Sequence, residues 1–328
     1  MEKNRGKSVK FLYSHDFARS FYAICLADGR LRCSNIVMND TAPHAPERRL
    51  AESPSSQPDV PFSHAIDAVG TAHAPAPGAR IVCLVPSITE LLCDLGLAGQ
   101  LVGRTGFCIH PAALVATIPK VGGTKDVNIG KIRQLLPTHA IVNIDENTKP
   151  TAEALAEFVP HLVVTHPRAP RDNLALARLM GAIFGKEEEA ERWCAQFGRE
   201  LAALEAMQPG AQRTVLYCIW RDPWMTISSD TYIARMLGEL GWQLPSFADP
   251  ARYPTFSWSE ELLDQIDAVL LSTEPFHFTD AHVEELASQI GKPVMLVDGE
   301  MMSWYGSRAV AGLGYLRTLR TMLERGIG

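Results

Sequence analysis

The chain has 328 residues, of which 46% are hydrophobic and 21% charged, and its formal net charge is -6. This length can bury one large core or two moderate ones, and we expect two lobes. Lysine and arginine are scattered and outnumbered, so no basic stripe is left to neutralise phosphates, which argues against a nucleic-acid partner. No run approaches the roughly 18 apolar residues that a membrane helix needs.

Residues 1–63 are predicted to be a disordered extension, because they lack a sustained hydrophobic period and residues 39–61 are rich in Pro, Ser, Ala and charge. The basic start matches a signal peptide poorly, since His15, Asp16 and Arg19 interrupt the apolar stretch that follows it. The seven cysteines include no CxxC pair, so no disulfide framework is expected. Cys83 and Cys93 are expected to be small buried hydrophobes.

The segment RIVCLVPSITELLCDLGL, residues 80–97, is predicted to be a buried strand that runs directly into a helix. Its unbroken aliphatic run is typical of a strand covered on both faces. Pro86 ends the strand, Ser87 with Glu90 indicates a capping box, and Gly96 closes the helix. The helix N-terminus would then lie at the carboxyl edge of a parallel sheet, where open α/β sheets bind ligands.

Strand and helix patterns alternate on both sides of a long helical signal. The first lobe, residues 64–168, has predicted strands within 80–86, 101–106, 140–145 and 162–167 and helices at 87–97, 128–136 and 151–158. The linker, residues 169–208, is one long helix or two, with Gly181 and Gly185 as possible bends. The second lobe, residues 209–328, has predicted strands within 214–220, 267–272 and 293–299 and helices at 232–240, 259–264, 281–290 and 307–324. The predicted fold class is α/β, with two parallel-sheet lobes joined by a long backbone helix and a ligand cleft between them. A helical hinge is stiffer than extended strands, so closure should be only a few degrees.

Polar and aromatic side chains follow several predicted strands, where a two-lobed α/β protein would have its cleft. These loops are residues 107–110, 122–125 and 145–149 in the first lobe, and 220–224, 274–278 and 298–308 in the second. An aromatic wall opposite a polar wall would suit a large, partly apolar ligand that also forms hydrogen bonds. The other interpretation is that individual tryptophans plug lobe edges. The candidate ligand-binding residues are Ser87, Phe107, His110, Thr124, Glu146, Trp220, Arg221, Trp224, Phe276, Trp304, Tyr305 and Arg308.

The sequence predicts no metal ligands and no catalytic motif. The pairs His161 with His166 and His277 with His282 lack the spacing of a zinc site. Cys108 with His110 is a better-spaced pair, but we prefer to interpret it as part of a loop packed under the cleft. Residues 122–125, GGTK, lack the Walker spacing, and no nucleophile elbow, kinase set or dinucleotide fingerprint is present. We therefore expect a protein that is not an enzyme; the rival hypothesis is a metal-dependent enzyme that uses His110 and Glu300.

Several segments in combination resemble the substrate-binding proteins of cobalamin and ferric-siderophore ABC importers, and the cobalamin type most closely. These segments are DAVG, RIVCLVPSITELLCDLGL, LVGRTGFCIHP, KVGGTKDVNIGKIRQLLP, LLSTEPF and LVDGEMMSWYGSR. The resemblance implies a class III periplasmic-binding-protein-like receptor that captures cobalamin, another corrinoid or an iron chelate such as a siderophore complex or haem. It also implies no catalytic cofactor, a monomer, a periplasmic location, and an ABC permease with its ATPase as partner. The alternative is a cytoplasmic corrinoid or metal-chelate binding or sensing protein on the same fold.

The chain departs from the resembled family at two places. The family has an aromatic residue where this chain has Thr124. The family also docks on its transporter through one surface glutamate per lobe; the second-lobe position matches Glu260 or Glu261, but the first-lobe position aligns with Gly130.

Overall fold

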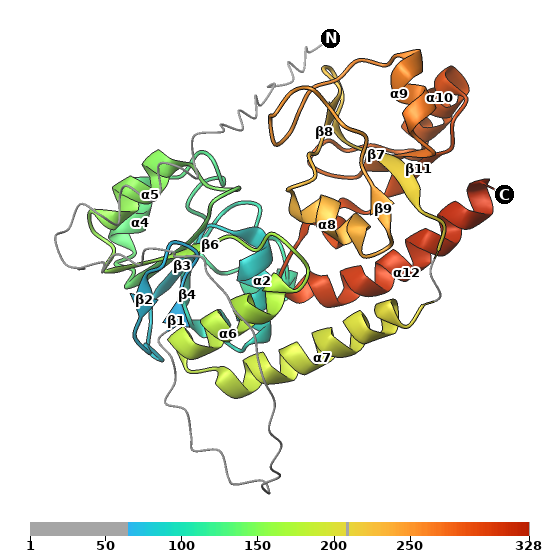
Figure 1. The fold of residues 1–328 in the computed structure, drawn as a ribbon. Coiled ribbons are helices and arrows are strands. Elements are labelled where there is room, and N and C mark those ends of the chain that lie inside the picture. Colours follow the sequence, from blue (N-terminus) through green and yellow to red (C-terminus); the bar gives the residue numbers. More distant parts are fainter. Residues whose placement is uncertain (1–64, 208–209, 328) are drawn as a thin grey trace, which may run out of the picture.

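The computed structural model describes residues 65–207 and 210–327, and the extension predicted for residues 1–63 lies outside this range. Two α/β lobes flank a pair of long helices, α7 (Glu187–Glu205) and α12 (Ser307–Ile327), which pack along each other (Figure 1). The predicted α/β architecture of two lobes with a helical backbone is therefore confirmed. Within the described ranges, no helix has both the length and the apolar character that crossing a bilayer requires.

The first lobe is built on a four-stranded parallel sheet in the order β4-β3-β5-β6. Its strands are β3 (Ile81–Cys83), β4 (Leu101–Arg104), β5 (His139–Asn143) and β6 (His161–Thr165). Its helices are α2 (Pro86–Asp94), α3 (Ala112–Val115), α4 (Ile129–Gln134) and α5 (Lys149–Ala156), with a 3-10 turn at Ala98–Gln100 and a small hairpin of β1 (Ala65–Ile66) and β2 (Ala72–His73). The loops after β3, β5 and β6 therefore leave the sheet at one edge, as the sequence predicts.

The capping box predicted at the start of α2 is wrong. Val85 is the N-cap, and the helix start has no side-chain cap. Pro86 occupies the first helical turn and has no N–H, so one of the amides that a cap would satisfy is absent. The buried Ser87 hydroxyl does not cap the helix, and the Glu90 carboxylate instead lies 2.9 Å from the Arg308 guanidinium.

The linker consists of two helices, α6 (Asp172–Phe184) and α7, and the break falls at one of the two predicted glycines. Gly185 has a φ of 67° and ends α6 in the left-handed conformation, which favours glycine. Gly181 stays helical. A Cβ there would come within 2.7 Å of the Ala190 Cβ, so this glycine allows close helix packing and does not bend the chain.

The second lobe is built on a five-stranded sheet in the order β11-β10-β7-β8, with β9 paired to β7. Its strands are β7 (Arg213–Trp220), β8 (Met225–Thr226), β9 (Trp242–Gln243), β10 (Ala268–Ser272) and β11 (Val294–Val297), and its helices are α8 (Tyr232–Gly238), α9 (Glu260–Gln265), α10 (Asp280–Ile290) and α11 (Gly299–Ser303). The pairs β10–β11, β10–β7 and β7–β9 are parallel, as predicted, whereas the short β8 runs antiparallel to β7. The reason is the short connection of residues 221–224, which allows a hairpin but no crossover.

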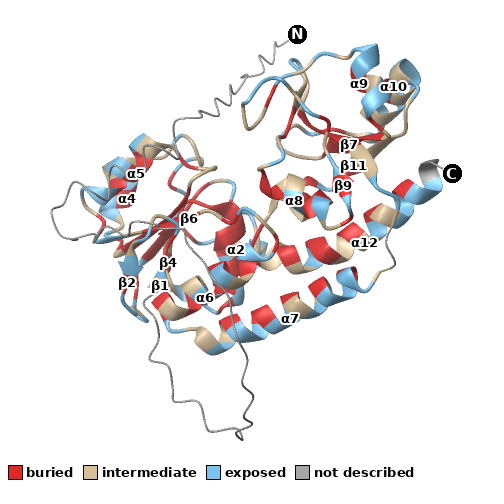
Figure 2. Ribbon diagram, in the orientation of Figure 1, coloured by how far each residue is buried: buried red, intermediate tan, exposed pale blue. Residues whose placement is uncertain are grey.

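One hydrophobic core cluster extends through both lobes and the helices between them. It contains Leu91 of α2, Phe197 of α7, Tyr217 of β7 and Leu313 of α12, all fully buried. Figure 2 shows buried residues along the facing sides of these elements. Cys83 and Cys93 are buried and free, as are the other cysteines of the described ranges. Because the core is continuous, the lobes share a stiff base, which favours a small closure motion.

Candidate ligand-binding site between the lobes

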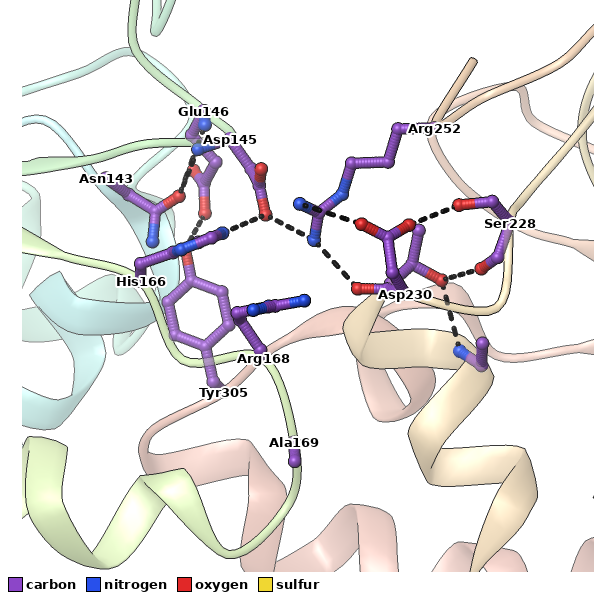
Figure 3. Close-up of polar contacts among 12 residues, drawn as sticks. Asn143, Asp145, Glu146, His166, Arg168, Ala169, Ser228, Asp230, Arg252 and Tyr305 are labelled. Carbon is purple, nitrogen blue, oxygen red and sulfur yellow. Dashed lines mark hydrogen bonds and ion pairs between the residues drawn. The ribbon is translucent and has the colours of Figure 1, made fainter. Parts of the chain in front are cut away.

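The turn after β5 presents two carboxylates towards the second lobe. The Asn143 side chain accepts hydrogen bonds from the backbone N–H groups of Asp145 and Glu146, at 2.8 and 3.3 Å. The Asn147 side chain accepts from Asn143 N at 2.8 Å and donates to the carbonyls of Leu84 and Thr124, at 3.3 and 3.1 Å. The turn is therefore fixed by two buried amides, and its carboxylates have defined positions (Figure 3).

The loop between α11 and α12 brings the second lobe into contact with this turn. Gly306 N donates to the Asn173 side chain at 2.6 Å, and Asn173 in turn donates to the Tyr232 hydroxyl at 2.9 Å. Gly306 has a φ of 74°, and a Cβ there would approach the Ser87 carbonyl to 3.2 Å, so only glycine fits this close passage. The neighbouring Tyr305 hydroxyl donates to the Glu146 carboxylate across the lobe boundary.

The two carboxylates of the turn have different electrostatic environments. Burial raises the pKa of Glu146 to about 7, although the Tyr305 hydrogen bond and the Lys125 charge oppose the rise. Burial also acts to raise the pKa of Asp145, but contact with His166 and the charges of Arg252 and Lys125 outweigh it, and the net pKa is lowered. Arg252 Nη2 lies 3.1 Å and His166 Nε2 3.4 Å from Asp145 Oδ2. Asp145 is therefore ionised at neutral pH, whereas Glu146 titrates close to neutral pH.

A second polar group lies around Arg308, on the first turn of α12. Its guanidinium lies 2.9 Å from Glu90 of α2 and 2.9 Å from Glu300 of α11. Glu300 lies 3.5 Å from His110 Nε2, and the His110 ring meets the edge of Trp304 with centroids 5.7 Å apart. This group also joins the two lobes, because Glu90 and His110 belong to the first lobe and the other three residues to the second.

The structure divides the predicted ligand-binding residues into separate groups. Glu146 with Tyr305, and His110 with Trp304 and Arg308, meet at the lobe boundary. Three others have these surroundings: Ser87 is buried beneath the Tyr305–Gly306 loop, Phe107 is 58% exposed on the loop after β4, and Thr124 contributes a carbonyl to the Asn147 side chain.

The remaining predicted residues lie in the second lobe. The Trp224 ring stacks on Phe278 with centroids 5.9 Å apart, and Trp220 meets Phe276 edge-on with centroids 5.5 Å apart. Arg221 donates two hydrogen bonds of 2.9 Å to Glu285 of α10. Trp220 and Trp224 thus pack against phenylalanine rings of their own lobe. Such packing is what the second interpretation of the sequence predicts, in which individual tryptophans fill the edges of the lobes.

Sequence reasoning missed several charged residues of the boundary. His166 directly follows β6, so the rule that selected Glu146 after β5 also applies to it. Arg252 lies in the irregular stretch between β9 and α9, where no local pattern marks it. Lys125 and Asp145 lie in the predicted cleft loops at 122–125 and 145–149 but are not among the candidate ligand-binding residues. Glu90 and His166 are predicted in other roles, as part of a helix cap and of a possible metal pair, and Asp230 and Arg252 are missed altogether.

In the two histidine pairs considered as metal ligands, three of the four members contact residues outside their own pair. His161 stacks on His139 with centroids 4.6 Å apart, His166 lies against Asp145, and His282 accepts a hydrogen bond from Thr279 N at the start of α10. Among the described residues, no group of three or more His, Cys, Asp or Glu could hold a metal ion.

Together, the two lobes, the helical backbone and a polar boundary contributed by both sheets define a class III periplasmic-binding-protein fold. Residues 81–290 match the model of the periplasmic binding protein family, and the chain belongs to that family. The resemblance identified in the sequence is thus confirmed at the level of the family. Comparison with curated proteins gives no match.

Solved structures share this fold at low sequence identity. The periplasmic vitamin B12 binding protein BtuF of Vibrio cholerae is 17% identical, with a TM-score of 0.63, over 76% of this chain and 100% of that chain. The periplasmic heme-binding protein RhuT from Roseiflexus sp. RS-1 is 20% identical, with a TM-score of 0.62, over 76% and 100%. The periplasmic heme binding protein HutB of Vibrio cholerae is 22% identical, with a TM-score of 0.62, over 74% and 98%. These similarities concern the fold.

Proposed function

We propose that this protein captures cobalamin, a related corrinoid or an iron chelate such as haem between its lobes and delivers it to an ABC permease. The observation that carries the proposal is the meeting of polar and aromatic side chains from both lobes at one boundary. Tyr305 bonded to Glu146, and His110 against Trp304, combine flat apolar surface with hydrogen-bonding groups. Such a combination suits a large macrocycle or chelate with a polar rim. Structures of similar fold include proteins named for vitamin B12 and for heme.

The continuous core supports a receptor with a largely preformed site. The helices α7 and α12 pack along each other, and α2 packs on α12, so the base of both lobes is one packed unit. A rigid ligand can be bound at low entropic cost when the site changes little on binding. The boundary contacts are polar, and they can exchange partners with a ligand without disturbing this core.

Delivery to a permease requires a docking surface on each lobe. In the second lobe, Glu260 and Glu261 are exposed in the first turn of α9, whose N-cap is Ser259. In the first lobe, the corresponding turn of α4 has the exposed Gly130 and Lys131. The missing first-lobe carboxylate favours a second candidate function, a cytoplasmic corrinoid or metal-chelate binding or sensing protein that docks on no permease.

The first test is a binding experiment with the full chain. Corrinoids and ferric chelates are coloured, so protein purified from a ligand-replete host should carry their absorbance. Added cobalamin, haemin or a ferric siderophore should quench tryptophan emission saturably, since Trp304 lies at the boundary. The ligand should be recovered unchanged after incubation, whereas a metal-dependent enzyme using His110 and Glu300 would convert it. Absence of saturable quenching by all of these compounds would refute the proposal.

Fractionation of cells that express the full chain separates the two candidate functions. A periplasmic protein would support delivery to a permease. A cytoplasmic protein that still binds its ligand would support handling or sensing.

A further inference from the structure

Glu274 holds the indole ring of Trp304, although it is not among the candidate ligand-binding residues of the sequence. Trp304 Nε1 donates a hydrogen bond of 2.8 Å to Glu274 Oε1, and the Ser303 hydroxyl donates to the same oxygen at 2.9 Å. Glu274 follows β10, and Trp304 is the C-cap of α11, which follows the neighbouring parallel strand β11. The bond therefore joins two adjacent strand ends of the second lobe.

The surroundings at the end of β10 fix the position of Glu274. The Ser272 hydroxyl donates to the Glu274 carbonyl at 2.6 Å. Gly299, the first residue of α11, makes room for the side chain, because a Cβ there would lie 2.5 Å from Glu274 Cγ and 2.6 Å from Ser272 Oγ. Gly299 N also donates to the Thr273 hydroxyl at 2.9 Å, which ties α11 to the loop that carries Glu274. The carboxylate therefore lies in a space that the absence of a side chain at Gly299 leaves free.

The Glu274 carboxylate is held at an electrostatic cost that its two hydrogen bonds partly offset. Glu274 is half-buried, and burial raises its pKa, with the negative charges of Glu300 and Asp298 adding to the rise. The hydrogen bonds from Ser303 and Trp304 oppose it. An apolar residue of the same length would avoid the cost, but it would leave the Trp304 N–H without this acceptor.

The tethered ring lies among residues of both lobes. The Arg308 guanidinium lies over the Trp304 ring, 5.0 Å from its centroid, and the His110 ring lies at 69° to it with centroids 5.7 Å apart. Only His110 belongs to the first lobe, so opening of the lobes would remove that contact and leave the bond to Glu274. A ring that is already fixed loses less rotational freedom when a ligand packs against it. The bond to Glu274 therefore prepares Trp304 for binding.

We propose that Glu274 is a positioning residue of the ligand site, which fixes the Trp304 indole against which the ligand packs and does not itself contact the ligand. The inference rests on the proposed function and deepens it, because it names the residue that keeps the aromatic part of the site preformed. The affinity should then depend on a hydrogen-bond acceptor at position 274 and not on its charge. This dependence should disappear when residue 304 has no N–H.

The test replaces Glu274 by two residues of similar length that differ as acceptors, Gln and Met. Because the test also changes a tryptophan, binding of cobalamin, haemin and ferrichrome to the full chain is measured by isothermal titration calorimetry. Glu274→Met should weaken the binding of each compound that binds by about three- to tenfold, the fold-change expected when one more side chain must be immobilised. Glu274→Gln should stay within about twofold of wild type, because its amide oxygen accepts the same bonds. The matched control is Glu284→Met, at an exposed glutamate of α10, which should bind like wild type.

A double-mutant cycle with Trp304→Phe separates positioning from any other role of Glu274. Phe keeps an aromatic ring but has no N–H, so in this background Glu274→Met should weaken binding by less than about twofold. Trp304→Phe removes the same bond from the other side, so alone it should give the same three- to tenfold loss, and it keeps the test decisive if Glu274→Met does not fold.

Three results would overturn the inference while the proposed function stands. They are unchanged affinity in Glu274→Met or in Trp304→Phe, an equal loss in Glu274→Gln and Glu274→Met, and an equal effect of Glu274→Met in both backgrounds. No saturable binding of any of the three compounds to the wild-type protein would refute the proposed function, and the inference with it.

Discussion

Replacing Glu146 by Gln should change how the stability of the protein depends on pH. The folded-state pKa of Glu146 is raised from 4.5 to about 7, chiefly by burial. At 1.36 kcal/mol per pKa unit, a rise from 4.5 to about 7 corresponds to about 3 kcal/mol. Gln keeps an acceptor for the Tyr305 hydroxyl but cannot ionise, so the substitution removes this cost and preserves the contact.

The direction of the effect follows from proton linkage. Below about pH 4.5, Glu146 is protonated in both the folded and the unfolded state, and its burial costs no charge. Between about pH 4.5 and 7, Glu146 ionises in the unfolded state but stays protonated in the folded state, and above about pH 7 the folded state holds a buried carboxylate, so the difference no longer grows. The wild-type protein should therefore lose stability relative to Glu146→Gln between about pH 4.5 and 7, by up to about 3 kcal/mol.

Urea unfolding at pH 5 and pH 8, followed by tryptophan fluorescence, measures this change. The useful quantity is the difference between the free energies of unfolding of variant and wild type, because the other titrating groups cancel in it. The control is Glu153→Gln on α5, the same carboxylate-to-amide change at a side chain that is 46% exposed and therefore carries no comparable burial cost. A Glu146→Gln difference that changes by less than about 1 kcal/mol between the two pH values would refute the assigned burial cost.

Three further predictions concern binding, the extension and docking. Trp304→Ala should weaken ligand binding by about 1 to 3 kcal/mol in a fluorescence titration; unchanged affinity with a lower unfolding temperature would make this tryptophan purely structural. Removal of residues 1–60 should leave the unfolding temperature and the affinity unchanged, because that composition buries too little apolar surface to offset its ordering entropy, and a large fall in unfolding temperature would contradict this. Glu260→Lys should abolish transport without changing ligand affinity, and Gly130→Glu should tighten the complex with a cobalamin-type permease, since a Cβ at Gly130 meets nothing closer than 3.6 Å; if neither substitution alters transport, the cytoplasmic alternative is favoured.

The order of the elements could be predicted from the sequence because local patterns determine it. The aliphatic run before Pro86 and the similar runs at 140–145 and 268–272 each form a strand, since such runs suit strands covered on both faces. Asn128 caps α4 by accepting a hydrogen bond from Lys131 N at 2.8 Å, so the helix begins where the pattern places it. These features depend on residues close together in the chain.

Features that depend on distant residues were less predictable. Ser87 and Glu90 have the spacing of a capping box, but Arg308, which is far away in the sequence, binds the Glu90 carboxylate. Arg252 belongs to the site only because the second lobe brings an irregular segment against the turn that holds Asp145. Burial and pairing of this kind follow from tertiary packing, which no local spacing encodes.

The contacts between the lobes divide into two kinds, and this division limits how the protein can respond to a ligand. Leu91 and Leu313 belong to a core that is fully buried. Separating the elements of this core would expose apolar surface to water, at a free-energy cost of roughly 25 cal/mol per Å². The boundary contacts of Glu146 and Arg252 are polar, and a ligand or water can replace their partners at a smaller net cost. Opening should therefore break the polar contacts and leave the core intact, so under the proposed function we expect the boundary residues, and not the helical base, to set both the affinity and the extent of closure.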